Sequence, residues 1–407
     1  MANVMEHPLK DAGKVTVRML IWLCVAVCFL IVAGSCVQET EAPVAGGNDP
    51  GVLVKPVGQA EQLTIFLTGN ELGALKPCGC SGGQLGGLDR RPPVFSRVPR
   101  ERRLIIDTGS LVPSDSLQDI YKFSILHRAF DLLDYDVVNL SAEDLRMARN
   151  QGLLANPQTD LVSSYVESDE QVGRAFTKRY TLRGRPLDIV IVPFDPESMP
   201  IADVAELLES ETNGLILKIV ILNNGGAETV ELVKQSIPSL DCLVCPAESD
   251  EPLRVSEPGN RPLVFSMGRY GKYVCELQVT SPADGGTNPQ LSFRKLAVTE
   301  DLDPNDLLEQ LYKQYQRMVR DSNLLESHPR YPLSDGLRYV GSEACRICHE
   351  EESDKWDTTR HADAYATLER EDVGSEADPE CVGCHVIGFD YEGGFVTKEK
   401  TPKLKDV

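Results

Sequence analysis

Two CxxCH motifs lie in the last quarter of the chain, in "EACRICHE" (343–350) and "ECVGCHV" (380–386). CxxCH is the attachment signature of c-type haem. Two thiols three residues apart on one helical turn can reach two vinyl groups on neighbouring edges of the porphyrin, and the following histidine can offer a nitrogen to the iron. The motifs predict at least two covalently bound haem c groups, with Cys345, Cys348, Cys381 and Cys384 as attachment residues and His349 and His385 as axial ligands.

A zinc ribbon or a set of disulfides could use the same four cysteines. Three features favour haem over zinc. The segment between the pairs, 349–380, is longer than the usual ribbon spacing of about 15–20 residues. Zinc does not require the histidine that follows each pair, and the chain carries an export signal, described below, as covalent haem attachment in bacteria requires.

The second axial ligands are less well defined by the sequence. The chain has six histidines, so His361, twelve residues after His349, is a candidate distal ligand, and a solvated helix histidine is the alternative. His328 in "SHPRYP" is a weaker candidate.

The stretch "YVGSEACRICHEEESDKWDTTRHADAYATL…DPECVGCHVIGFDYEGGF" resembles the cytochrome c-554 family of multihaem cytochromes over 339–395. The resemblance implies closely packed haems, mostly ligated by two histidines each, with His361 in the matching distal position. It also implies further CxxCH motifs beyond the "GGF" stretch. The sequence stops at Val407, where the next haem cysteine is expected, so we expect a C-terminal truncation and regard two haems as a minimum.

The first 36 residues resemble an export signal. Lys10, Lys14 and Arg18 precede the apolar run "MLIWLCVAVCFLIVAG", which ends in "AGSC". The run is shorter than the roughly 20 residues that span a bilayer. "AGSC" resembles a bacterial lipoprotein box and predicts lipidation at Cys36, with plain cleavage and an uncleaved anchor as alternatives. Lipidation, plain cleavage and an uncleaved anchor all imply export of the rest of the chain. We therefore expect a location on the periplasmic side, with Cys36 lipidation as the expected membrane anchor.

Length and composition bound the remaining possibilities. The chain has 407 residues, enough for two domains, and 42% hydrophobic residues. The net charge of −21 argues against nucleic-acid binding, because an acidic surface repels the phosphate backbone.

Segments along the chain predict the elements that position these residues. A Pro- and Gly-rich tether covers 37–60. Short apolar, β-branched runs then alternate with helical patterns, which predicts an α/β domain over 61–298. The expected strands are 63–67, 103–107, 136–140, 188–193, 215–222, 241–245, 262–267, 273–279 and 291–298. The interval 299–337 is expected to hold an amphipathic helix (301–322) and a linker, and 338–407 an incomplete, mainly helical haem-packed module.

The order of segments over 61–298 resembles the metallophosphatase domain of 5′-nucleotidase-like enzymes. "LTGNELG", "LIIDTGSL", "LLDYDVVNLSAEDL", "IVILNNGG" and "SLDCLVCPAESD" match successive blocks of that domain. The resemblance implies a four-layer αββα sandwich whose hydrolytic chemistry uses two metal ions.

The metal ligands of that family are mostly replaced. The matching positions hold Asn70, Leu72, Ser110, Ser141, Ala142 and Asn224, with Ala247 and Ser249 near the last block. The domain contains a single histidine, His127, in an expected helix. We therefore expect no phosphatase metals and a catalytically dead domain.

Four further cysteines follow strands at the expected active-site edge: Cys78, Cys80, Cys242 and Cys245. In an oxidising compartment these can form disulfides, and a metal or redox site that uses all four is the alternative.

The sequence favours a multihaem electron-transfer cytochrome with redox protein partners and a scaffolding or docking α/β domain. A 5′-nucleotidase-type hydrolase with a haem appendage is one alternative, and a haem-based redox enzyme or sensor is another.

Overall fold

The computed structural model describes residues 61–405, except 78–82, 155–158, 167–170, 210–212, 248, 258, 283–284 and 371–373. Cys36, Cys78, Cys80 and the expected signal and tether lie outside the described residues. Pro56–Val407 forms one compact unit. Within the described ranges, no helix has the length and apolar character needed to cross a bilayer.

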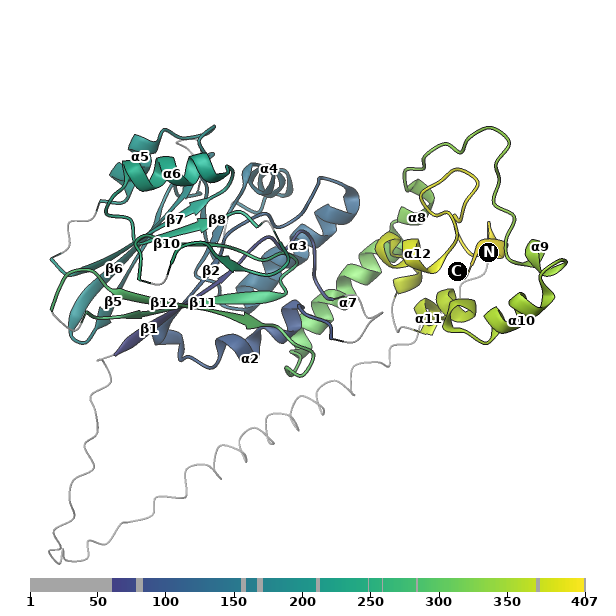
Figure 1. Cartoon of the computed structure of the whole chain (residues 1–407), viewed down its shortest axis with the longest axis horizontal. Coiled ribbons are helices and arrows are strands. Elements are labelled where there is room, and N and C mark those ends of the chain that lie inside the picture. The colour runs from purple at the N-terminus through teal and green to yellow at the C-terminus, as the bar shows by residue number, and fades with distance from the viewer. Residues whose placement is uncertain are drawn as a thin grey trace, which may run out of the picture. The chain divides into compact units, whose positions relative to one another are not determined.

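Two six-stranded sheets form the α/β domain among the described residues (Figure 1). The first sheet has the order β12 (Gln290–Ala297), β11 (Tyr273–Thr280), β1 (Gln62–Thr68), β2 (Arg103–Asp107), β3 (Val137–Asn139) and β4 (Asp160–Val162). The second has the order β5 (Phe176–Leu182), β6 (Arg185–Phe194), β7 (Leu215–Leu222), β8 (Cys242–Cys245), β10 (Leu263–Ser266) and β9 (Leu253–Arg254).

The central strands of each sheet are parallel. Strands β1 to β4 run parallel in the first sheet, and β6, β7, β8 and β10 run parallel in the second. The loops after parallel strands gather at one edge of a sheet, the position at which ligands bind in such folds.

The sheets pack face to face, and each has helices on its outer side, which gives four layers. Alternation along β1 shows the arrangement: Ile65 and Leu67 lie in the core between the sheets, whereas Phe66 lies in the outer core. Helices α2 (Pro92–Phe95), α3 (Leu117–Leu132) and α4 (Ala142–Gln151) contribute to the outer core of the first sheet. Helices α5 (Ile201–Leu207) and α6 (Ala227–Ser236) cover the second. This confirms the expected αββα sandwich.

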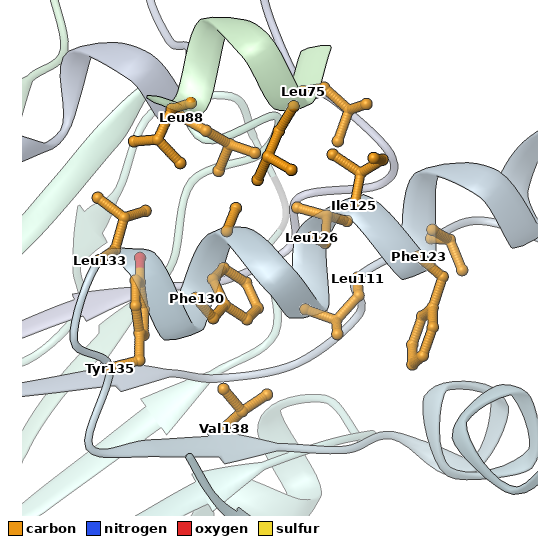
Figure 2. Packing of buried hydrophobic residues seen from close by; sticks show 14 of the residues in the cluster. Leu75, Leu88, Leu111, Phe123, Ile125, Leu126, Phe130, Leu133, Tyr135 and Val138 are labelled. Atoms are coloured by element: carbon orange, nitrogen blue, oxygen red, sulfur yellow. The ribbon is translucent and has the colours of Figure 1, made fainter. Parts of the chain in front are cut away.

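Helix α3 is the centre of the outer core of the first sheet. Ser116 begins it by accepting a hydrogen bond from the backbone N–H of Asp119, a standard N-cap. Figure 2 shows Phe123, Leu126 and Phe130 of α3 among the apolar side chains of this core. Their spacing of three and four residues places them on one helical face.

Helix α7 (Asp306–Asp321) begins later than the expected residue 301. Pro304 precedes the N-cap residue Asn305, whose side chain accepts hydrogen bonds from the N–H groups of Leu307 and Leu308. Leu311 and other buried residues of α7 join the same outer core as α3. The helix is therefore packed on the α/β domain as part of its helical layer.

The C-terminal module consists of short helices with little apolar core. Helix α8 (Leu324–Ser327) lies in the expected linker, and the module itself holds α9 (Glu343–Arg346), α10 (Glu350–Asp357), α11 (Ala364–Arg370) and α12 (Pro379–His385) among its described residues. Its buried cluster holds Leu325, Tyr365, Leu368, Val382, Val386, Phe389, Phe395 and Leu404. The module is mainly helical, as expected.

Candidate functional sites

The second CxxCH motif lies on α12, which has a well-defined start. Asp378 is the N-cap, and its side chain accepts a hydrogen bond of 2.9 Å from the N–H of Glu380. Pro379 occupies the first helical position, where its fixed φ suits the helix. Cys381, Cys384 and His385 then follow within two helical turns, with Cys384 exposed and Cys381 half-buried.

His385 ends α12 with a defined ring orientation. Its Nδ1 lies 2.5 Å from the carbonyl oxygen of Ala364 and 3.3 Å from Oγ1 of Thr367. A carbonyl oxygen can only accept, so Nδ1 carries the proton and donates to it. The neutral ring then has its lone pair on Nε2, the nitrogen that a metal-ligating histidine offers when Nδ1 is held in this way.

The first CxxCH motif forms a more open turn. The N–H groups of Cys348 and His349 both donate to the carbonyl oxygen of Cys345, at 3.1 and 3.0 Å. Arg346 is paired with Asp354 and Asp357 of α10, which ties the motif to that helix. Both cysteines are exposed, and the side chain of His349 is 65% exposed.

The exposed apolar surface around the first motif fits a flat apolar cofactor. Ile347, between the two cysteines, is 87% exposed, and Val340 and Leu337 just before the motif are also exposed. Large apolar side chains exposed together mark a surface that a ligand or partner covers. Because the module buries few apolar residues of its own, a haem attached to these thiols would supply the missing apolar contact.

The two candidate distal histidines have different surroundings. His361 is exposed on the short 3₁₀ helix Arg360–Asp363, between α10 and α11. His328 stacks on Phe389 with ring centroids 4.2 Å apart, and its Nε2 lies 2.8 Å from Oδ1 of Asp390. Asp390 therefore already engages the Nε2 of His328, so the exposed His361 remains the better placed candidate.

Loops at one edge of the first sheet have an unusual backbone conformation. Asn70, Leu72 and Ser110 all have positive φ, at 52°, 48° and 59°. Such a conformation is strained for residues other than glycine and concentrates at functional sites. The N–H groups of Asn70 and Leu72 donate to the carbonyl oxygens of Gly109 and Ser110 at 2.8 and 3.2 Å, which holds the two loops together.

Neutral polar side chains hydrogen-bond one another at this edge of the sheets. The Nδ2 of Asn139 donates to Oδ1 of Asn223, and the Nδ2 of Asn223 donates to Oγ of Ser164. Ser141 caps α4 in a capping box with Asp144, while Asn224 is exposed. Asn139, Asn223 and Ser164 thus bond one another, and none of the three carries an imidazole or a carboxylate, the side chains that most often ligate catalytic metals.

Among the described residues, which include both CxxCH motifs and most of the sheet edge, no three or more His, Cys, Asp or Glu side chains are grouped as metal ligands would be. Cys345, Cys348, Cys381 and Cys384 therefore do not form one cluster in this structure.

Cys242 and Cys245 are both on strand β8. They are three residues apart on β8, so their side chains point to opposite faces of the sheet. Cys242 lies in the core between the sheets, and Cys245 packs against the core beneath α5 and α6. The two thiols therefore face opposite sides of the sheet, and a site made from all four cysteines stays a prediction. Roles that involve Cys78 and Cys80 stay predictions, because both lie outside the described residues.

A buried charged network behind the sheet edge was missed by the sequence analysis. Nη2 of Arg91 lies 2.6 Å from both carboxylate oxygens of Glu71, and Nη1 donates to the hydroxyl of Tyr135 at 3.0 Å. Thr68 hydrogen-bonds Tyr135 at 2.8 Å and donates to Asp107 at 2.6 Å. Burial raises the pKa of Asp107 to about 7, and the charge of Glu71 adds to this shift. No sequence signal points to the network, whereas the Asp-Pro before the second CxxCH could have located the start of α12.

The geometry thus defines two classes of domain in one chain: a cytochrome c-like module with helical CxxCH turns, and a metallophosphatase-like sandwich. Residues 344–407 match the family "Cytochrome c554 and c-prime". Cytochrome c-554 from Nitrosomonas europaea is 32% identical over 89 residues, covering 18% of this chain and 37% of that protein. The chain thus spans little more than a third of its curated relative. The C-terminal part is similar to c-type cytochromes, and this similarity implies covalently bound haem c.

Solved structures with a similar fold correspond to the α/β domain. A 5′-nucleotidase precursor from Thermus thermophilus superposes with a TM-score of 0.50 at 19% identity, covering 67% of this chain and 61% of that one. A calcineurin-like phosphoesterase from Bacillus subtilis gives a TM-score of 0.48 at 13% identity, covering 63% of this chain and 97% of that one. The first comparison confirms the metallophosphatase-like fold.

Proposed function

We propose that this protein is an exported electron-transfer cytochrome that binds at least two haem c groups and uses a phosphatase-like domain without hydrolytic activity as a scaffold. The observation that carries the proposal is the repeated CxxCH turn, together with the orientation of His385. When bound, haem c supplies one-electron redox chemistry. The residues of the chain attach it, orient its ligands and limit its contact with water.

Each part of a haem site has a candidate residue. The exposed thiols of Cys345 and Cys348 are accessible for thioether formation, as is that of Cys384. The Nδ1 hydrogen bond of His385 fixes its tautomer and makes Nε2 the ligating atom. His361 is the proposed distal ligand for one iron.

Loss of hydrolytic activity is proposed from the chemistry of the sheet edge. Two-metal hydrolysis needs ligands that hold both ions and an activated water between them. Asn70, Leu72, Ser110 and Ser141 stand at positions where the resemblance requires ligands, and Asn139 and Asn223 bind each other.

The location and partners follow from the sequence. We propose that the chain is exported to the periplasmic side and held at a membrane through lipid at Cys36, with redox proteins as partners and no nucleic acid. Replacing Cys36 with Ala should release the protein from the membrane fraction. Unchanged membrane association of that variant would contradict the lipid anchor.

The deciding experiment is a reduced-minus-oxidised absorption spectrum of the full chain, matured in an export-competent host. We expect a haem c α-band, with about half of its intensity lost when Cys381 and Cys384 are both replaced by Ala. Cys275→Ser is the matched control, because this buried thiol lies in the α/β domain. A parent protein without the band would overturn the proposal. Carbon monoxide binding by the reduced parent would instead indicate an open iron position and favour a sensor or redox enzyme.

Hydrolytic activity is tested separately with nucleotide and aryl phosphate substrates. We expect no turnover above background with added Mn²⁺ or Zn²⁺. Activity that chelation abolishes and metal restores would contradict the proposed loss and favour the 5′-nucleotidase alternative.

A further inference from the structure

The second haem-binding helix begins at a buried polar contact with the α/β domain. Asp378, the N-cap of α12, is 3% exposed. Its Oδ2 accepts from the hydroxyl of Tyr315 on α7 at 2.9 Å, and its Oδ1 accepts from Nε2 of Gln118 on α3 at 2.9 Å. Gln118 also donates to the hydroxyl of Tyr315 at 2.8 Å, so the three side chains form a closed group.

Neighbouring residues extend this contact on both sides. One helical turn beyond Gln118, the buried Nζ of Lys122 pairs with Oε1 of Glu380, in the first turn of α12. Ser375 precedes α12, and its Oγ accepts a hydrogen bond of 3.2 Å from Nε2 of Gln316 on α7. Both residues are buried. Each of these contacts joins α3 or α7 to the segment 375–380.

The contact extends directly into the haem motif. The N–H of Cys381 donates to the carbonyl oxygen of Asp378 at 3.0 Å, and the N–H of Val382 donates to the same oxygen at 2.9 Å. Asp378 therefore fixes both the start and the first turn of the helix that carries Cys384 and His385. A carboxylate held by two buried side-chain donors has little freedom to shift, since each donor it loses leaves buried charge less well satisfied.

We infer that Asp378, Tyr315 and Gln118 are positioning residues for the second haem site, so that the phosphatase-like domain is a structural part of that site. The inference rests on the proposed function of the second CxxCH motif. It explains how a domain without hydrolytic chemistry can still be needed. Helices α3 and α7 set the position of α12, and α12 carries His385 to its hydrogen bond with Ala364 of α11.

The test uses the full haem-loaded chain with Tyr315→Phe and Gln118→Leu combined, which removes both side-chain donors from other helices. Amide hydrogen exchange over residues 379–385 should become about tenfold faster, in keeping with the loss of hydrogen bonds to a charged group. The midpoint potential of the second haem should shift, and that of the first should not. Tyr121→Phe is the control, because its hydroxyl bonds Ser322 at 2.8 Å and joins the same region without touching Asp378.

A second pair of variants separates positioning from a general loss of folding. Asp378→Ala removes the cap, whereas Asp378→Asn keeps an acceptor oxygen for the N–H of Glu380 and should restore most of the exchange protection and potential. A double variant of Tyr315 and Gln118 that loads haem with the parent's exchange rate and potentials would overturn the inference. A parent without haem would overturn the proposed function instead, and exchange in the apoprotein would still test the contact.

Discussion

Replacing Arg91 with Met should strongly destabilise the α/β domain, because it removes the cation from a buried group of charges. Arg91 is 1% exposed and Glu71 is 0% exposed. Asp107, also fully buried, is joined to them through Thr68 and Tyr135. Without the guanidinium, two buried carboxyl groups have no positive partner.

The magnitude follows from the burial of the pair. Breaking a buried ion pair by removing one partner costs about 3–5 kcal/mol, because the remaining charge is uncompensated. Burial raises the pKa of Glu71, and the pKa of Asp107 is raised to about 7. The charge of Arg91 opposes both shifts, so its removal should raise both values further.

The sign of the pH dependence follows from those shifts. A carboxyl whose folded pKa lies above its unfolded value binds more protons when folded, so its contribution to stability is lost as the pH rises toward the folded pKa. The loss approaches about 1.4 kcal/mol per pH unit for each such group. Arg91→Met should therefore be least destabilising near pH 5 and most destabilising near pH 8.

Urea unfolding of the full haem-loaded chain, followed by far-ultraviolet circular dichroism at pH 5.5 and 8, measures this difference. Arg90→Met is the matched control, since the adjacent Arg90 is half-buried and pairs with the carbonyl oxygen of Gln84 at 3.4 Å. The control should cost less than about 1 kcal/mol. Equal losses for the two variants, or a loss in Arg91→Met that does not change with pH, would refute the reasoning.

Three further predictions test other parts of the structure. Asp144→Ala should cost about 3 kcal/mol in urea unfolding, because it removes the N3 half of the capping box of α4 and leaves the N–H groups of Ser110 and Leu111 without their acceptor. A cost below about 1 kcal/mol would contradict this. Asp107→Asn should flatten the decline in stability expected between about pH 4 and pH 7, seen as a smaller change in urea midpoint across that range. When the apoprotein is treated with iodoacetamide, peptide mass spectrometry should find Cys348 labelled and Cys242 protected. Cys348 is exposed, whereas burial raises the pKa of the Cys242 thiol. Equal labelling of the two cysteines would be inconsistent with the fold.

Much of the α/β domain could be predicted because its central strands are buried on both faces. Strands β2 and β7 have the predicted limits, since each is mostly apolar and almost wholly buried, with Lys218 as the one charged residue inside β7. Strand β5 was missed because its exposed positions hold Thr177, Arg179 and Thr181, and only its two terminal residues are buried. Edge strands of this kind owe their pairing to a neighbour, here β6, and carry a weak signal of their own.

The proposed covalent chemistry rests on the sequence alone. A CxxCH motif fixes the spacing of two thiols and an imidazole within one helical turn, so the attachment residues around His349 and His385 need no tertiary information. The scarcity of histidine in the α/β domain was equally visible in the sequence, because folding cannot supply an imidazole that the chain lacks.

The tertiary structure alone decided which partners these residues have. Arg91 donates a hydrogen bond to Tyr135 and interacts electrostatically with Asp107, and Asp378 accepts a hydrogen bond from Gln118. These residues are far apart in the sequence, so no local pattern predicts the contacts. Such contacts depend on how strands and helices distant in sequence pack together, and a buried charge or cap is stable only if that packing supplies its partner. The sequence therefore determined where haem can attach, and the packing of α3 and α7 decided what holds the second attachment helix in place.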